Sequence, residues 1–190
     1  MSSLVSLVSS PPPLESTAAQ QPSYVTYHFP VPCSSGSAAK TSMSPSWGAV
    51  TTLESRHILS SSGTTGLRTW EAALHLGAYL SSNGQESGKL WVRGKHVLEL
   101  GAGTGLLSIL CAKHLATRTV TATDGDERVL ETLENNAFLN MPESDTIKSF
   151  PFRWGRSLVG TLLEKRIMAD DPVDLVIGAD IVGFRTICFG

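Results

Sequence analysis

One glycine-rich segment, Glu99 to Gly105 (ELGAGTG), holds the residues best suited to bind a small ligand. Glycine allows a tight turn, and without a Cβ atom it lets a ligand approach the backbone. The segment directly follows a short apolar sequence at 96–100 that predicts a strand. It precedes an apolar stretch from Leu106 to Leu115 that predicts a buried helix. Ligands in α/β proteins bind beyond the carboxyl ends of parallel strands, so this turn is a candidate binding loop.

A single acidic residue, Asp124, is the second candidate. It ends a predicted strand at 119–123 and lies 23 residues after Gly101. A carboxylate at this position can accept hydrogen bonds from the hydroxyls of a ribose. Together the loop and the acid predict a ligand of the adenosine type. The alternative is that Asp124 only starts the next helix, which Asp126 can cap.

The spacing of the glycines separates two classes of adenosine ligand. Dinucleotide enzymes favour G-x-G-x-x-G, in which the helix N-terminus faces a pyrophosphate. Here the pattern is G-x-G-x-G, because the third glycine comes one residue early and position 106 is Leu. This favours S-adenosylmethionine, which has no pyrophosphate. Binding of an NAD-type cofactor is the alternative.

Composition and charge argue against several other functions. A formal net charge of −2 over 190 residues does not suggest a nucleic-acid-binding protein. No run approaches the ~20 apolar residues of a membrane span, and the N-terminus lacks the charged region of a signal peptide. We therefore expect a cytoplasmic protein without a membrane partner. The five histidines and three scattered cysteines show no ligand spacing, so no metal site is expected; the cysteines are Cys33, Cys111 and Cys188.

Two parts of the chain differ in composition. We expect residues 1–60 to be a mostly disordered Ser/Pro-rich extension, in which Tyr24–Phe29 and Val50–Leu59 could pair as a β-hairpin. From Ser61 onward, helices and strands alternate, which predicts an α/β fold with a parallel sheet. Besides the elements above, we expect helices at 69–80 and around 129–137, a loop at 81–88, and strands near 147–152 and at 173–178.

Four segments of this second part carry a family resemblance: Gly66–Ala73, Glu99–Gly105, Trp154-Gly155 and Gly178–Asp180. They resemble the eukaryotic seven-β-strand (class I) protein-lysine methyltransferases, most of all the elongation factor 2 lysine methyltransferases of fungi and animals. The resemblance covers about residues 61–182. It implies a Rossmann-like three-layer sandwich with a mostly parallel sheet, in which 61–182 is the N-terminal half of a domain that binds S-adenosylmethionine.

The resemblance also implies roles for single residues. The resemblance places Trp154 against the adenine, whereas Glu99 is expected within the site from its own position before the glycine turn. Without the family resemblance, Trp70 and Trp154 could be core residues, and Glu99 could be a surface charge. The remaining cofactor contacts implied are Trp70 at the pocket, Gly101, Ala102 and Gly103 at the methionine portion, Asp124 at the ribose, and Ala179 along the wall.

The acceptor side of the site is less well matched. In the resembling enzymes an acid-x-x-Tyr motif shapes the lysine pocket; Asp180 supplies the acid and is the candidate catalytic residue, but Gly183 stands at the Tyr position. Residues 183–190 match nothing in the family, so we expect a chain that lacks the C-terminal strands. The strand at 173–178, interior in the family, would then be an apolar edge, which favours poor solubility or weak cofactor binding.

Three functions follow as hypotheses. The first is a protein-lysine N-methyltransferase acting on a translation elongation factor, with elongation factor 2 as the preferred protein partner. The second is a truncated, non-catalytic module that binds the cofactor or a partner without turnover. The third is a small-molecule methyltransferase, because the cofactor-binding fold does not reveal the acceptor.

Overall fold

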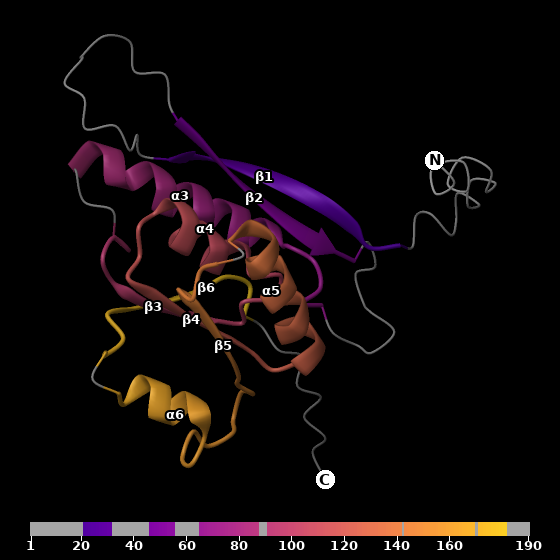
Figure 1. Ribbon diagram of the computed structural model, residues 1–190, viewed down its shortest axis with the longest axis vertical. Coiled ribbons are helices and arrows are strands. Elements are labelled where there is room, and N and C mark those ends of the chain that lie inside the picture. The colour runs from indigo at the N-terminus through magenta and orange to yellow at the C-terminus, as the bar shows by residue number, and fades with distance from the viewer. Residues whose placement is uncertain are drawn as a thin grey trace, which may run out of the picture.

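The computed structural model describes residues 21–31, 46–55, 65–87, 91–141, 143–169 and 171–181 (Figure 1). The predictions for residues 1–20, for the unmatched tail at 183–190 and for Gly183 lie outside these residues. Within them, no helix is both long and apolar enough to cross a membrane.

A four-stranded sheet in the order β5-β4-β3-β6 forms the centre of the molecule, and all its pairings are parallel. The predicted α/β fold with a mostly parallel sheet is therefore confirmed. After β5 the chain crosses back past β4 and β3, so β6 joins the sheet on the other side of β3. In the part of the chain that the structure describes, β6 is one edge of this sheet and β5 is the other. The strands are β3 (His96–Leu100), β4 (Thr119–Asp124), β5 (Ile147–Pro151) and β6 (Leu175–Gly178).

Helices lie on both sides of this sheet (Figure 1). Three of them, α3 (Glu71–Ser87), α4 (Leu106–His114) and α5 (Glu127–Asn140), lie together on one side. On the other side is the short helix α6 (Leu162–Ile167). Asp126 caps α5 as predicted, because its side chain accepts a hydrogen bond from the backbone N–H of Arg128.

Helix α4 is the centre of the hydrophobic core. Its residues from Leu106 to Cys111 are all buried, because one side packs on the sheet and another is covered by the N-terminal hairpin. Full burial of each leucine in this helix contributes about 1.5–3 kcal/mol. The helix that follows the glycine loop is thus firmly held, and so is the end of that loop at Gly105.

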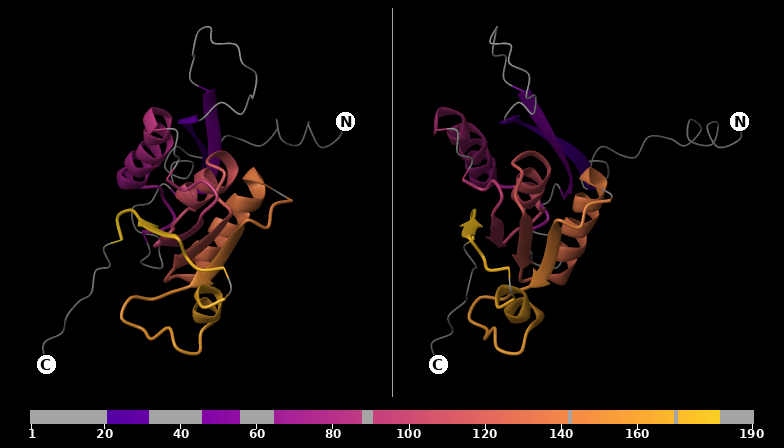
Figure 2. Two further views of the ribbon diagram at one scale, coloured as in Figure 1. Left: turned by 90° about the vertical axis from the view of Figure 1, so that its left-hand side faces the viewer. Right: turned by 60° about the vertical axis from the view of Figure 1, so that its left-hand side comes forward.

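An antiparallel hairpin of β1 (Ser23–Val31) and β2 (Ser46–Glu54) covers the helix layer (Figure 2). Its second strand begins and ends earlier than the expected Val50–Leu59. Alternate residues of β2 are buried from Gly48 to Glu54, so this stretch has the period of a half-buried strand. Gly48 permits the close approach, because a Cβ atom there would lie 2.8 Å from the ring of His114.

One expectation about the helices was wrong, and one helix had not been predicted. The segment predicted as a loop at 81–88 continues α3 to Ser87, with Ser81 buried and the Ser82 hydroxyl bonded to the Ala78 carbonyl. Helix α6 was not expected at all. Its signal was the T-x-x-E sequence of a capping box. Thr161 accepts from the N–H of Glu164, and the Glu164 carboxylate accepts from the N–H of Gly160, one residue before the cap.

Candidate functional site

The glycine loop between β3 and α4 has a backbone that only glycine adopts readily. Gly101, Gly103 and Gly105 have φ angles of 64°, 55° and 82°. A Cβ atom on Gly103 would lie 3.2 Å from the carbonyl oxygen of Gly66, and one on Gly105 would lie 2.8 Å from the Leu133 side chain. Between the first two glycines, Ala102 is buried, and its N–H is bonded to β4. The loop is therefore bare backbone in a fixed conformation.

The carboxylate of Asp124 points at this loop from the end of the neighbouring strand. Its Oδ2 accepts from the N–H of Gly103 at 3.1 Å, and its Oδ1 accepts from the N–H of Asp126 at 3.2 Å. A carboxylate has about four acceptor positions, and three backbone N–H groups use it here, so about one position remains for a ligand. Burial raises the pKa of Asp124, and backbone hydrogen bonds from residues 126, 103 and 125 oppose this rise. Asp124 is thus more than a residue that starts a helix.

Glu99 lies buried at the base of the loop, with 3% of its surface exposed. The Ser108 hydroxyl on α4 donates to its carboxylate. Burial raises the pKa of Glu99 to about 7, although the hydrogen bonds from Ser108 oppose the rise. The alternative of a surface charge is therefore excluded. Its enclosed carboxylate supports the loop from within, and direct contact with a ligand stays a prediction.

The segment after β5 borders Asp124 on its far side. Phe152 donates its N–H to the carbonyl of Asp124 at 2.8 Å, and Arg153 Nε donates to the carbonyl of Gly125 at 2.9 Å. Trp154 packs edge-on against Phe152 with ring centroids 5.3 Å apart. Because Trp154 remains 47% exposed, it is not a core residue. Its contact with an adenine stays a prediction.

The segment that precedes α3 covers the glycine loop. Gly66 lies directly over Gly103, as the short distance to its carbonyl shows. Trp70 is half-buried, its Nε1 donates to the carbonyl of Thr65 at 3.1 Å, and the guanidinium of Arg68 lies 5.9 Å from its ring centroid. The ring is held in place but is not part of the buried core.

The end of β6 borders the loop on the side opposite Asp124. Ala179 is partly buried, and Asp180 is exposed with a φ of 55°, a left-handed conformation that Asp tolerates. Ile181 follows, and its side chain is 3.1 Å from where a Cβ atom of Gly101 or Gly178 would be. Asp180 therefore lies at the same edge of the sheet as the loop, one strand along.

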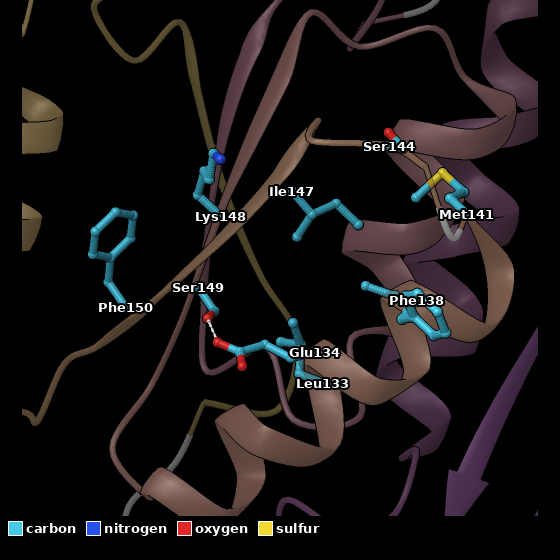
Figure 3. Close-up of a pocket in the computed structure, with 10 residues that line it drawn as sticks. Leu133, Glu134, Phe138, Met141, Ser144, Ile147, Lys148, Ser149 and Phe150 are labelled. Atoms are coloured by element: carbon cyan, nitrogen blue, oxygen red, sulfur yellow. Dashed lines mark hydrogen bonds between the residues drawn. The ribbon is translucent and has the colours of Figure 1, made fainter.

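The predicted site residues thus gather along the carboxyl ends of β3, β4, β5 and β6, together with Trp70 from the covering segment. The sequence did not predict that Thr69, Asn136 and Ile181 contact or support the loop. It also did not predict the role of Thr104 within the glycine-rich segment. A separate groove of about 330 Å³ lies between α5 and β5 (Figure 3). It contains none of the predicted residues; its lining includes Phe138, Met141, Ile147, Lys148 and Phe150.

Fold and site together define a class of protein. The sheet order changes direction between β3 and β6, and the glycine loop lies at this switch point with an acid on the adjacent strand. Open α/β sheets bind nucleoside-containing ligands at such a point, so this is a Rossmann-like nucleoside-cofactor domain.

Comparison with known proteins identifies the family. Residues 56–187 match the lysine methyltransferase family, and the chain belongs to it. It is 46% identical over 95% of its length to protein-lysine N-methyltransferase EFM3 of Chaetomium thermophilum, of which it covers 50%. It is 42% identical to human protein-lysine N-methyltransferase EEF2KMT over 50% of the chain and 27% of that protein. It is 36% identical to mouse EEF1A lysine methyltransferase 3 over 60% of the chain and 43% of that protein. The chain thus spans half or less of these relatives.

Proposed function

We propose that this chain forms the cofactor-binding part of an S-adenosylmethionine-dependent protein-lysine N-methyltransferase that acts on a translation elongation factor in the cytoplasm. The observation that carries the proposal is the carboxylate of Asp124 facing a bare glycine loop in a member of the lysine methyltransferase family. An elongation-factor substrate is supported by the names of the human and mouse relatives, EEF2KMT and EEF1A lysine methyltransferase 3.

The residues at the strand ends fit the parts of this cofactor. The remaining acceptor position of Asp124 suits a ribose hydroxyl, and the partly exposed Trp154 offers an aromatic ring for a purine. The methionine portion would lie along the loop backbone at Gly101 and Gly103, beside the Ile181 side chain and the Gly66 carbonyl. S-adenosylmethionine supplies a methyl group that its sulfonium already activates. The protein then has mainly to align the acceptor with that methyl group and to exclude water.

Methyl transfer also requires that the amine of the acceptor lysine is uncharged. Its amine has a solution pKa near ~10.4 and must be presented neutral, either by desolvation or by a nearby proton acceptor. Asp180, exposed at the end of β6, is the candidate acceptor of that proton.

A second candidate function is a module that binds the cofactor without turnover. It is favoured by Gly183, which stands where the resembling enzymes carry the Tyr of their acid-x-x-Tyr motif.

The test is transfer of a labelled methyl group from S-adenosylmethionine to purified elongation factor 2, followed by mass spectrometry of the labelled peptide. We expect label on a lysine, and none with the Asp124→Ala variant. Cofactor binding without transfer would support the second candidate. Absence of binding by calorimetry would refute the cofactor assignment itself.

A further inference from the structure

One buried side chain joins the N-terminal hairpin to the glycine loop. Asn136 on α5 is 1% exposed. Its Oδ1 accepts from the N–H of Leu53 in β2 at 2.8 Å, and its Nδ2 donates to the carbonyl of Thr104 at 3.0 Å. An amide is suited to this place because it accepts at one atom and donates at another. Two hydrogen bonds of the Asn136 side chain therefore connect the hairpin to the glycine loop.

A second connection converges on the same loop residue. Glu54, the last residue of β2, is buried and accepts from the hydroxyls of Thr52 at 2.7 Å and Tyr27 at 3.1 Å. Its other oxygen accepts from the N–H of Thr69 at 3.2 Å, and the Thr69 hydroxyl shares a hydrogen bond of 2.7 Å with the hydroxyl of Thr104. Burial and the nearby Glu54 raise the pKa of Tyr27 to about 12, so its hydroxyl keeps the proton that it donates.

These connections fix the segment that covers the loop. Glu54 holds Thr69, the residue before Trp70. The carbonyl of Gly66 lies against Gly103. The segment is thus held between the hairpin and the glycine loop. Left-handed backbone persists only where the surroundings determine it, and a binding site keeps its geometry only where such support exists.

We propose that Asn136 and Glu54 are positioning residues for the cofactor site, acting through Thr104, and that the β1–β2 hairpin is part of the binding machinery. This inference rests on the proposed function for the identity of the ligand. Its rival is that the two side chains only attach the hairpin to the domain.

The chain offers a matched control for that rival. Asn140 lies one turn after Asn136 on α5 and also holds β2, because it accepts from the N–H of Thr51 at 3.1 Å and donates to the carbonyl of Thr51 at 2.7 Å. Its other hydrogen bonds join it to the Asn136 carbonyl and to the Lys113 ammonium. None of these partners belongs to the glycine loop. Loss of Asn140 should loosen the hairpin alone, whereas loss of Asn136 should also release the loop.

The experiment compares Asn136→Ala with Asn140→Ala in the full 190-residue chain. Calorimetry measures affinity for S-adenosylmethionine, and thermal melting measures stability. Hydrogen exchange of the amides at 102–105, recorded without cofactor, measures the loop itself. We expect Asn136→Ala to weaken binding about tenfold, which corresponds to one lost buried hydrogen bond, and to speed exchange in the loop. Asn140→Ala should lower the melting temperature but leave affinity within about twofold and loop exchange unchanged.

Thr104 tests the second connection with small changes that preserve folding. Thr104→Ser keeps the hydroxyl and should keep the affinity, whereas Thr104→Val removes it and should weaken binding. Equal losses of affinity for the two asparagine variants, with equal loop exchange, would overturn the positioning role and leave the proposed function intact. Faster loop exchange in Asn136→Ala alone, with no binding even by the parent chain, would support the positioning role and refute the proposed cofactor.

Discussion

Replacing Glu99 by Gln should remove a pH dependence from the stability of the domain. Burial raises the pKa of Glu99 from 4.5 to about 7 in the folded chain. Between these two values the folded state keeps a proton that the unfolded chain has released. The contribution of Glu99 is therefore fully present below pH 4.5 and is lost as the pH rises to about 7. At about 1.4 kcal/mol per pKa unit, the loss is about 3 kcal/mol.

Gln is the appropriate replacement, because it is neutral and its amide can still bond the Ser108 hydroxyl. Urea unfolding of parent and variant at pH 5 and pH 8 gives the free energy of unfolding in each case. The parent should lose about 2–3 kcal/mol relative to the variant over this interval, because part of the unfolded-state titration lies below pH 5. The exposed Glu131→Gln serves as the control and should track the parent. Parallel curves for parent and Glu99→Gln would refute a carboxyl group whose pKa is raised by burial.

Three further predictions concern the site. Gly103→Ala and Gly94→Ala both place a side chain at positive φ, but only the side chain at 103 also meets the Gly66 carbonyl. Each variant should lower the free energy of unfolding in urea by about 1 kcal/mol or more. Only Gly103→Ala should weaken cofactor binding in calorimetry. Asp124→Asn should lower affinity about tenfold to a hundredfold, since an amide cannot accept at every position that the carboxylate offers; unchanged binding would remove Asp124 from the site. Trp154→Ala should shift the melting temperature little, because the side chain is 47% exposed, yet weaken binding about tenfold through lost stacking on the adenine; equal affinity would place the adenine elsewhere.

The elements that form the site could be predicted because local signals agreed with tertiary structure there. The strand at His96–Leu100 is apolar and directly followed by glycines, and Asp126 after β4 is a strong N-cap. Both the boundaries and the parallel arrangement followed from these signals. The convergence of the predicted site residues followed from one physical rule, that carboxyl ends of parallel strands meet at one sheet edge.

Other features depended on packing that the sequence does not display. Ser81 looked like a loop residue but is buried within α3. The buried Glu54 at the end of β2 accepts hydrogen bonds from Tyr27, Thr52 and Thr69, which the sequence does not display. Asn136 lies on the predicted helix, but its two partners are 83 and 32 residues away in the chain. Helix α6 had a readable capping box, but only six residues and no apolar period to accompany it.

The most direct test of the cofactor site is a crystal structure of the chain with S-adenosylhomocysteine. We predict that a ribose hydroxyl lies about 2.5–3.0 Å from the carboxylate of Asp124, with the adenine beside Trp154 and the amino-acid portion along the glycine loop. A nucleoside bound away from β3 and β4, or one whose ribose makes no hydrogen bond with Asp124, would contradict the account.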